Sequence, residues 1–270
     1  MRRLGAQVAI LAYLLAMAAF LLGPVLVVMA ISVNPFGYSI FPPRGFSMRW
    51  YLEVLNDPQW RASIGISLLI ALASSVIVTT TGTMAAVGLR RWNSAFRDGL
   101  VAVLMSPLLL PGLITGLAIL FFFSLVGALG ASWTLILGHA VITYPYVLRL
   151  VYAALSRDTA TYEEAARTLG ASPVVTFFQV TLPLIRSGIF GGAVFAFIIS
   201  FDNITVSIFL SNPRMVTLPI RILEHIQWSG TPSVAAISTM MVVVTGGMAL
   251  LIERIGGLQS VFGGVPDESR

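Results

Sequence analysis

The sequence predicts an all-α, polytopic membrane protein with six transmembrane helices. Of its 270 residues, 57% are hydrophobic and only 10% are charged, a balance outside the range of soluble globular domains. Six apolar runs are long enough to cross the hydrocarbon core of a bilayer. The 16 basic residues are all Arg, and those near the ends of the runs mark the cytoplasmic side. The predicted spans are residues 8–31, 63–89, 100–125, 133–155, 187–210 and 233–252, in one transmembrane domain of residues 1–270.

The first apolar run follows Arg2 and Arg3 and superficially resembles a signal peptide. It exceeds the about 7–15 residues of a signal-peptide core and has no clear small-residue cleavage site, so we expect a retained transmembrane helix. The segment after it is expected outside the cell. Within it, residues 47–55 predict a short interfacial helix, because Trp50 and Tyr51 are residue types enriched in the headgroup layer.

The third predicted span carries two prolines, Pro107 and Pro111. Each removes a backbone donor and kinks or breaks the helix. Backbone carbonyls freed at membrane depth are tolerated only where protein or a water-filled cavity surrounds them, so this span is a candidate to line a polar pathway. A kink that serves packing alone is the open alternative.

Two polar side chains interrupt the later apolar runs. His139 is expected to form a hydrogen bond between helices rather than to bind a ligand. Asp202 should face a partner or an aqueous cavity, because an ionised carboxylate in lipid is costly. Its neighbours Phe201 and Asn203 offer an aromatic face for a cation and an amide for hydrogen bonds. The alternative is that Asp202 pairs with an Arg such as Arg221 and holds a gate.

The composition also excludes several kinds of chemistry within this chain. Without Lys there is no Walker A phosphate loop, so any ATP and Mg must be bound by another chain. Cys is absent and His occurs twice, which argues against disulfides, metal sites and catalytic centres. The net charge of +5 is scattered at membrane edges, so nucleic-acid binding is not expected.

A polar stretch at residues 157–185 separates the fourth and fifth predicted spans. The spacing from Thr161 to Glu164 is that of a capping box, so we expect a helix to begin at Thr161. Glu163 and Arg167 stand four residues apart in the favourable order for an ion pair. Gly170 then predicts a left-handed helix end.

A second short helix is expected directly after this glycine. Ser172 and Pro173 fit its N-cap and first turn, and Pro183 should end it. Its apolar residues are expected on one face; they are Val174, Phe177, Phe178 and Leu182. Two short helices joined at a glycine would make a rigid knob.

This stretch resembles the EAA loop of bacterial ABC importer permeases. That family has E-A-A, three residues, G, nine residues and I/V-x-L-P, and the chain matches each step through Glu164, Gly170 and Val180 to Pro183. The resemblance implies the type I ABC importer permease fold, with the loop as a cytoplasmic coupling helix that docks in the ATPase subunit. The coupling residues it implies are Glu163, Glu164, Ala165, Ala166, Arg167 and Gly170.

A second set of residues is similar to the second permease of spermidine/putrescine-type importers. The chain reads S-F-D-N at residues 200–203, then F-L-S, T-L-P and V-A-A, where the family pattern often has an acid in place of Asn203. The resemblance implies import of a polyamine or of a related amino compound with fewer charges, such as γ-aminobutyrate. The alternatives are an ABC permease for iron(III) or an oxyanion and, less favoured, an ion-coupled secondary carrier, which usually has more intramembrane ionisable residues.

The resemblance also implies partners and a location. These are a homologous permease subunit forming a heterodimer, a cytoplasmic ABC ATPase dimer that binds ATP and Mg, and an external substrate-binding protein. The chain itself is then a transport subunit and not an enzyme. It is expected in the bacterial inner membrane, in contact with lipid, with both termini cytoplasmic and a disordered tail at residues 257–270.

Overall fold

The computed structural model describes residues 2–92 and 94–256, so the predicted tail at 257–270 lies outside the described residues. Within the described part, regular structure is helical apart from an isolated bridge between Asn212 and Met215. The helices are α1 (Arg2–Ser32), α2 (Arg49–Asn56), α3 (Pro58–Arg91), α4 (Ala95–Leu109), α5 (Gly112–Leu125), α6 (Ser132–Ala154), α7 (Arg157–Thr168), α8 (Pro173–Thr176), the π-helix η1 (Phe177–Thr181), α9 (Leu182–Phe201), α10 (Ser207–Leu210), α11 (Leu218–Trp228) and α12 (Ser233–Gly256).

Helix length and composition support a membrane protein. In the described residues, five helices are long and apolar enough to cross a membrane, and α4 with α5 makes a sixth span if the bent pair counts as one. The all-α membrane fold is therefore confirmed. The chain divides into two compact units, Met1–Ala62 with Arg221–Val244 and Ser63–Ile220 with Thr245–Arg270. The predicted coupling and pathway residues all belong to the second unit.

In the first unit, the end of α1 is tied to α2. The Trp50 indole N–H donates to the Asn34 carbonyl at 2.7 Å, and the Tyr51 hydroxyl lies 2.7 Å from Ser32 Oγ. A short helix is present where one was predicted, and Trp50 is only 3% exposed, so its ring is covered by the protein itself. The hydrogen-bonded indole anchors the helix. By contrast, the most apolar part of α1 is 0% buried within the chain.

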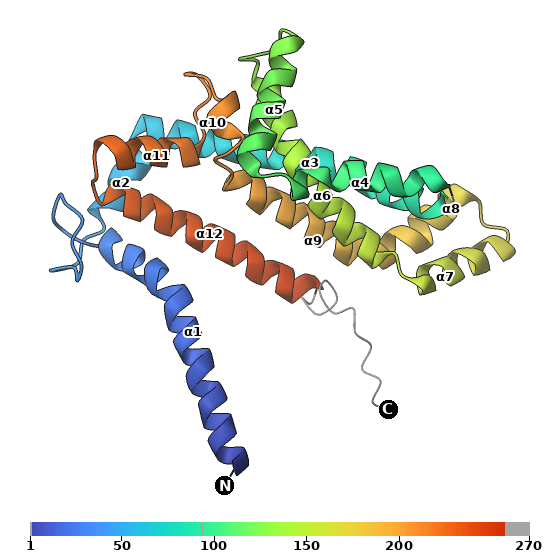
Figure 1. The fold of residues 1–270 in the computed structure, drawn as a ribbon, viewed down its shortest axis with the longest axis horizontal. Helices are drawn as coiled ribbons and strands as arrows, with labels where there is room; N and C mark the ends of the chain where they lie inside the picture. The colour runs from blue at the N-terminus through green and yellow to red at the C-terminus, as the bar shows by residue number, and fades with distance from the viewer. Residues whose placement is uncertain (1, 93, 257–270) are drawn as a thin grey trace. The chain divides into compact units, whose positions relative to one another are not determined.

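The second unit is built on the packing of α6 against α9 (Figure 1). A Cβ placed on Gly188 would lie 2.8 Å from the Leu150 carbonyl oxygen, and one on Gly192 would lie 3.2 Å from Val147 Cα. Small residues at these positions let the two backbones approach closely, which is how membrane helices gain packing energy. The pair is therefore a stiff core for the elements attached to it.

Two of the predicted spans are interrupted. Between α4 and α5 the chain bends by 112°, with Pro107 inside α4 and Pro111 preceding α5, so the predicted break in the third span is confirmed (Figure 1). The fifth span was predicted at 187–210, but the apolar helical segment runs over Pro173–Phe201 and ends before α10. The end has a local cause: Asn203 Oδ1 accepts the Val206 N–H at 2.9 Å and so competes with helical bonding.

Candidate functional site

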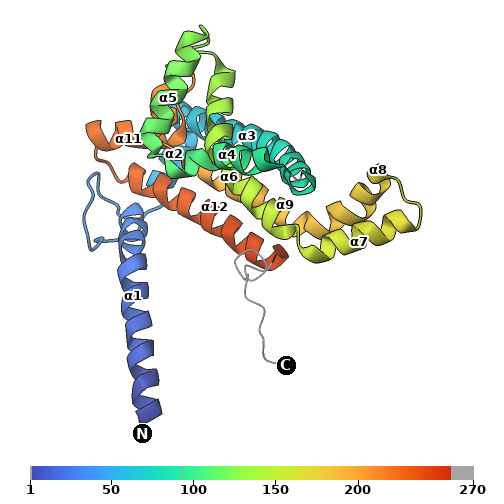
Figure 2. The same ribbon diagram turned by 45° about the vertical axis from the view of Figure 1, so that its right-hand side comes forward.

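Gly170 forms an elbow between α7 and α8 (Figure 2). The Gly170 N–H donates to the Arg167 carbonyl at 2.9 Å and the Ala171 N–H donates to the Ala166 carbonyl at 3.0 Å. These two bonds are the Schellman motif, which requires a left-handed residue, and Gly170 has φ of +89°. The predicted left-handed helix end is confirmed.

The start of α7 differs from the prediction. The helix begins at Arg157, where Ser156 Oγ accepts the Thr159 N–H at 3.4 Å, and Asp158 lies in the first turn. Thr161 is therefore inside the helix, and the capping-box prediction was wrong. A serine cap followed by an acidic residue, directly after the end of α6, is sufficient to begin the helix earlier.

The end of the elbow also differs from the prediction. Ser172 and Pro173 begin α8 as predicted, but Pro183 does not end a helix. Instead the chain continues through the π-turn η1 into α9, and the Leu182 N–H bonds to the Phe177 carbonyl. Pro183 lies in the first turn of α9. A wider π-turn before a proline accommodates the missing donor and the bulk of the ring, so the coupling region connects to α9 without a loop.

The two adjacent acidic residues of α7 point to different surroundings. Glu163 is 14% exposed, pairs with Arg91 of α3 at 3.2 Å and accepts a hydrogen bond from Thr181 Oγ1. Among the described residues this pairing takes the place of the predicted pair with Arg167. Glu164 and Ala165 are exposed. Glu163 therefore holds the elbow to its own chain, and Glu164 is free to meet a partner.

An apolar surface accompanies these exposed polar residues. Leu169 at the elbow is 89% exposed, and Val174 and Phe178 beyond it are 65% and 60% exposed. Exposed apolar side chains on an otherwise polar segment are typical of a protein-binding surface. Sequence reasoning placed Val174 and Phe178 on an apolar face but missed Leu169, although a leucine between Thr168 and Gly170 was a usable signal.

The interruptions of the third and fifth spans lie against each other. A Cβ on Gly112, at the start of α5, would lie 3.1 Å from Thr205 Oγ1, and one on Gly116 would lie 2.7 Å from Phe209 Cδ2. The first turns of α5 thus press directly on the segment that follows Asp202. Non-helical backbone at membrane depth is tolerated only against protein or a water-filled cavity, so this junction is the candidate pathway region.

The structure separates the three predicted pathway residues of the fifth span. Phe201 is 4% exposed and stacks on Phe197 at 5.7 Å between ring centroids. Asn203 Oδ1 is occupied by the Val206 N–H and by Thr205 Oγ1, the latter at 3.3 Å. Asp202 at the end of α9 is exposed. Of the three side chains, Asp202 is the exposed one, while Phe201 packs inside the protein and Asn203 bonds to the segment that follows it.

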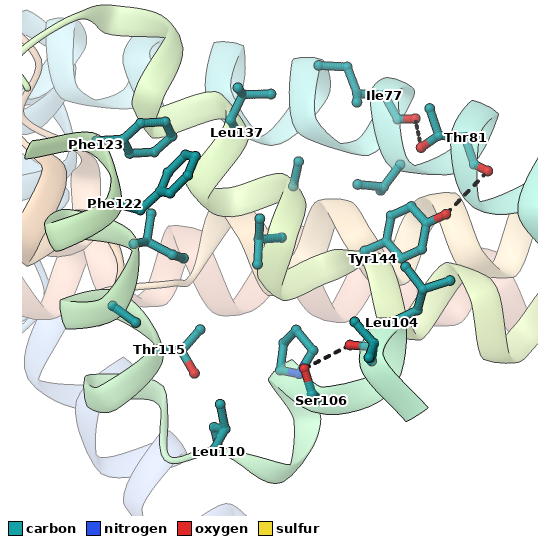
Figure 3. Close-up of a pocket in the computed structure, with 17 residues that line it drawn as sticks. Ile77, Thr81, Leu104, Ser106, Leu110, Thr115, Phe122, Phe123, Leu137 and Tyr144 are labelled. Carbon is teal, nitrogen blue, oxygen red and sulfur yellow. Dashed lines mark hydrogen bonds between the residues drawn. The ribbon is translucent and has the colours of Figure 1, made fainter. Parts of the chain in front are cut away.

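A cavity of about 620 Å³ lies beside the α4–α5 bend (Figure 3). Its wall comes from α3, α4, α5 and α6, is mostly apolar, and includes Pro107. The polar groups on it are hydroxyls, among them those of Ser106, Thr115 and Tyr144, and the Tyr144 hydroxyl donates to the Thr81 carbonyl at 3.5 Å. Pro107 thus lines the cavity. Pro111 is the N-cap residue of α5.

A family comparison identifies the class of protein. The model for "Binding-protein-dependent transport system inner membrane component" matches residues 78–258, which include the elbow and both interrupted spans. The chain belongs to this family. It is a multi-pass permease subunit of an ABC importer and works with other components of such a system. Its relatives are transport permeases and not enzymes.

Individual relatives agree with the family. The putrescine transport system permease protein PotI of Escherichia coli (strain K12) is 33% identical over 84% of this chain and 83% of its own length. The spermidine/putrescine transport system permease protein PotC of Haemophilus influenzae is 28% identical over 90% of this chain and 95% of its own. A crystal structure of a bacterial ABC transporter that imports the acidic polysaccharide alginate has the same fold, with a TM-score of 0.70, 16% identity, and coverage of 94% of this chain and 96% of that one.

Proposed function

We propose that this permease subunit imports a small cationic amino compound of the putrescine type, driven by ATP hydrolysis on a partner. The observation that carries the proposal is the exposed Asp202 carboxylate at the junction of the two interrupted spans. A carboxylate can form a charge-assisted hydrogen bond with a substrate ammonium group. The relatives named for putrescine and spermidine support the same substrate class.

The partners follow from the same proposal. A homologous permease forms a heterodimer with this chain, a cytoplasmic ATPase dimer binds ATP and Mg, and an external binding protein delivers the substrate. The exposed surface of the elbow, with Glu164 and Leu169, supports docking of the ATPase there. Arg167 is exposed on the same short helix and belongs to the proposed contact.

Uptake measurements test this function. Cells that lack their own polyamine importers should take up radiolabelled putrescine when this chain is expressed with its partner permease, ATPase and binding protein. Uptake should cease when the ATPase is omitted or its Walker A lysine is replaced. γ-Aminobutyrate, iron(III) and sulfate serve as competing substrates. Each represents one of the alternative substrate classes: a related amino compound, iron(III) and an oxyanion. Putrescine uptake without the ATPase would overturn the proposal in favour of a secondary carrier.

The orientation is a separate prediction. We expect the elbow and both termini in the cytoplasm, because Arg residues flank the elbow and the second-to-third span connection. The chain contains no Cys, so a single Ser172→Cys substitution reports on one exposed position. An impermeant maleimide should label it in inverted vesicles and not in intact cells. A Cys at Gly130, in the opposite connection, is the matched control and should show the reverse pattern.

A further inference from the structure

A buried histidine links three helices beside the proposed pathway. His139 of α6 is 1% exposed. Its Nδ1 lies 2.9 Å from Ser200 Oγ in α9, and its Nε2 lies 3.0 Å from Ser207 Oγ in α10. The predicted hydrogen bond between helices is therefore confirmed, and the ring makes two such bonds, one to α9 and one to α10.

The two serines stand on either side of the interruption in the fifth span. Ser200 lies in the last turn of α9 and Ser207 begins α10, so the chain between them contains Asp202. A single imidazole ring thus spans the break where backbone helix bonds are missing. We infer that His139 is a positioning residue that fixes the segment carrying Asp202.

The network reaches a fourth helix and the backbone around the break. Ser207 Oγ donates to the Asn203 carbonyl at 3.0 Å, in the segment before α10. Ser74 Oγ of α3 lies 3.0 Å from Ser200 Oγ and donates to the Ile70 carbonyl of its own helix at 2.7 Å. Linked hydrogen bonds in a buried site strengthen one another. The His139 ring therefore belongs to a network that ties α3, α6, α9 and α10 at one point.

The adjacent packing makes the link specific to this place. A Cβ on Gly138, next to His139, would lie 2.6 Å from Leu210 Cδ1 and 3.0 Å from Val206 Cγ1. The α6 backbone therefore touches α10 directly beside the ring. Hydrogen bonds depend on direction as well as distance, whereas apolar contacts do not, so the ring adds directed contacts to this close packing. His139 thereby fixes the position of the segment between Ser200 and Ser207.

A labelling experiment tests the inference without any transport measurement. A single Ile204→Cys in the otherwise Cys-free chain is partly exposed and reports on the Asp202 segment. His139→Leu should raise its rate of modification by a small maleimide roughly 3- to 30-fold, the range expected for losing interhelical hydrogen bonds in a membrane protein. A Cys at Ser172 in the elbow should keep its rate, because the elbow does not depend on this network.

Two partial variants and one control sharpen the result. His139→Asn keeps an amide near the Nδ1 position and His139→Gln keeps one near the Nε2 position, so each should give an intermediate rate. Thr143→Val removes another buried hydroxyl one turn away in α6, whose bonds go to the carbonyls of His139 and Ala140 in its own helix. It should change labelling at Ile204→Cys by less than about twofold.

The labelling result tests the positioning role of His139 by itself. Only its consequence for transport rests on the proposed function. Unchanged labelling at position 204 in His139→Leu, or an equal increase at position 172, would overturn the positioning role. If His139→Leu fails to accumulate in the membrane, the Asn and Gln variants carry the test. In the full importer, His139→Asn should raise the apparent KM for putrescine more than it lowers the maximal rate. Absence of putrescine uptake by the unmodified importer would instead reject the proposed substrate and leave the labelling result standing.

Discussion

Gly170→Val is expected to abolish uptake while the permease remains in the membrane. At φ of +89° a β-branched residue is strained by about 1–3 kcal/mol, an amount comparable with the net worth of the two Schellman bonds. Nothing lies within 4 Å of a Cβ built on Gly170, so the effect comes from the backbone and not from a clash. The strain is relieved by turning α8 relative to α7, which displaces the surface proposed to dock on the ATPase. Uptake and co-purification of the ATPase are the measurements.

A second glycine provides a matched control. Gly127 ends α5 in the same motif, with its N–H bonded to Ser124 and the Ala128 N–H bonded to Phe123, and it also has open space around it. Gly127→Val should cost comparable stability at φ of +68° but retain ATPase association. Gly170→Asn should restore most of the function, since Asn tolerates the left-handed region. Normal uptake by Gly170→Val would remove the coupling role of the elbow.

Asp202→Asn is expected to raise the apparent KM for putrescine by about tenfold to a hundredfold, the usual worth of a hydrogen bond to a charged group. The substitution preserves shape and removes charge. ATPase stimulation by the loaded binding protein should be largely retained, because the elbow and the α6–α9 packing are untouched. A gating role predicts instead a disturbed ATPase rate in the absence of substrate.

Charge removal elsewhere controls for a general electrostatic effect. Asp98 is an exposed carboxylate in α4 that pairs with Arg97 at 3.0 Å. Asp98→Asn removes the same charge away from the proposed pathway and should leave the KM unchanged. Uptake that is unaffected by Asp202→Asn would contradict both the contact role and the gating role of this residue.

The sequence was sufficient to predict that the spans exist, and it predicted one of their two interruptions. Long apolar runs predict membrane helices because the bilayer allows little else. The broken third span followed from Pro107 and Pro111, since proline removes a donor wherever it occurs. The break at Asp202 was not predicted, because it depends on Asn203 bonding to Val206 and on α5 packing against Thr205. The contact with α5 is distant in sequence and leaves no local pattern, and the Asn203 bond is local but does not by itself exclude a helix.

The candidate site shows the same division. Gly170 and Ser172 were predicted correctly because cap geometry is local. Thr161 was assigned wrongly as a cap, since a capping-box pattern says nothing of a competing serine at position 156. The difference between Glu163 and Glu164 also depended on tertiary structure, because it is Arg91 of another helix that turns Glu163 inward.

The close packing of α6 on α9 gives the chain a mechanical property. The elbow joins the end of α6 to the start of α9, and Asp202 lies at the opposite end of α9. The 20 residues of α9 span about 30 Å, so a rotation of about 10° about the elbow end moves the far end by about 5 Å. With glycine contacts holding the two helices as one stiff rod, the pair would act as a lever arm that turns a small rotation at the elbow into a displacement of several ångströms at Asp202.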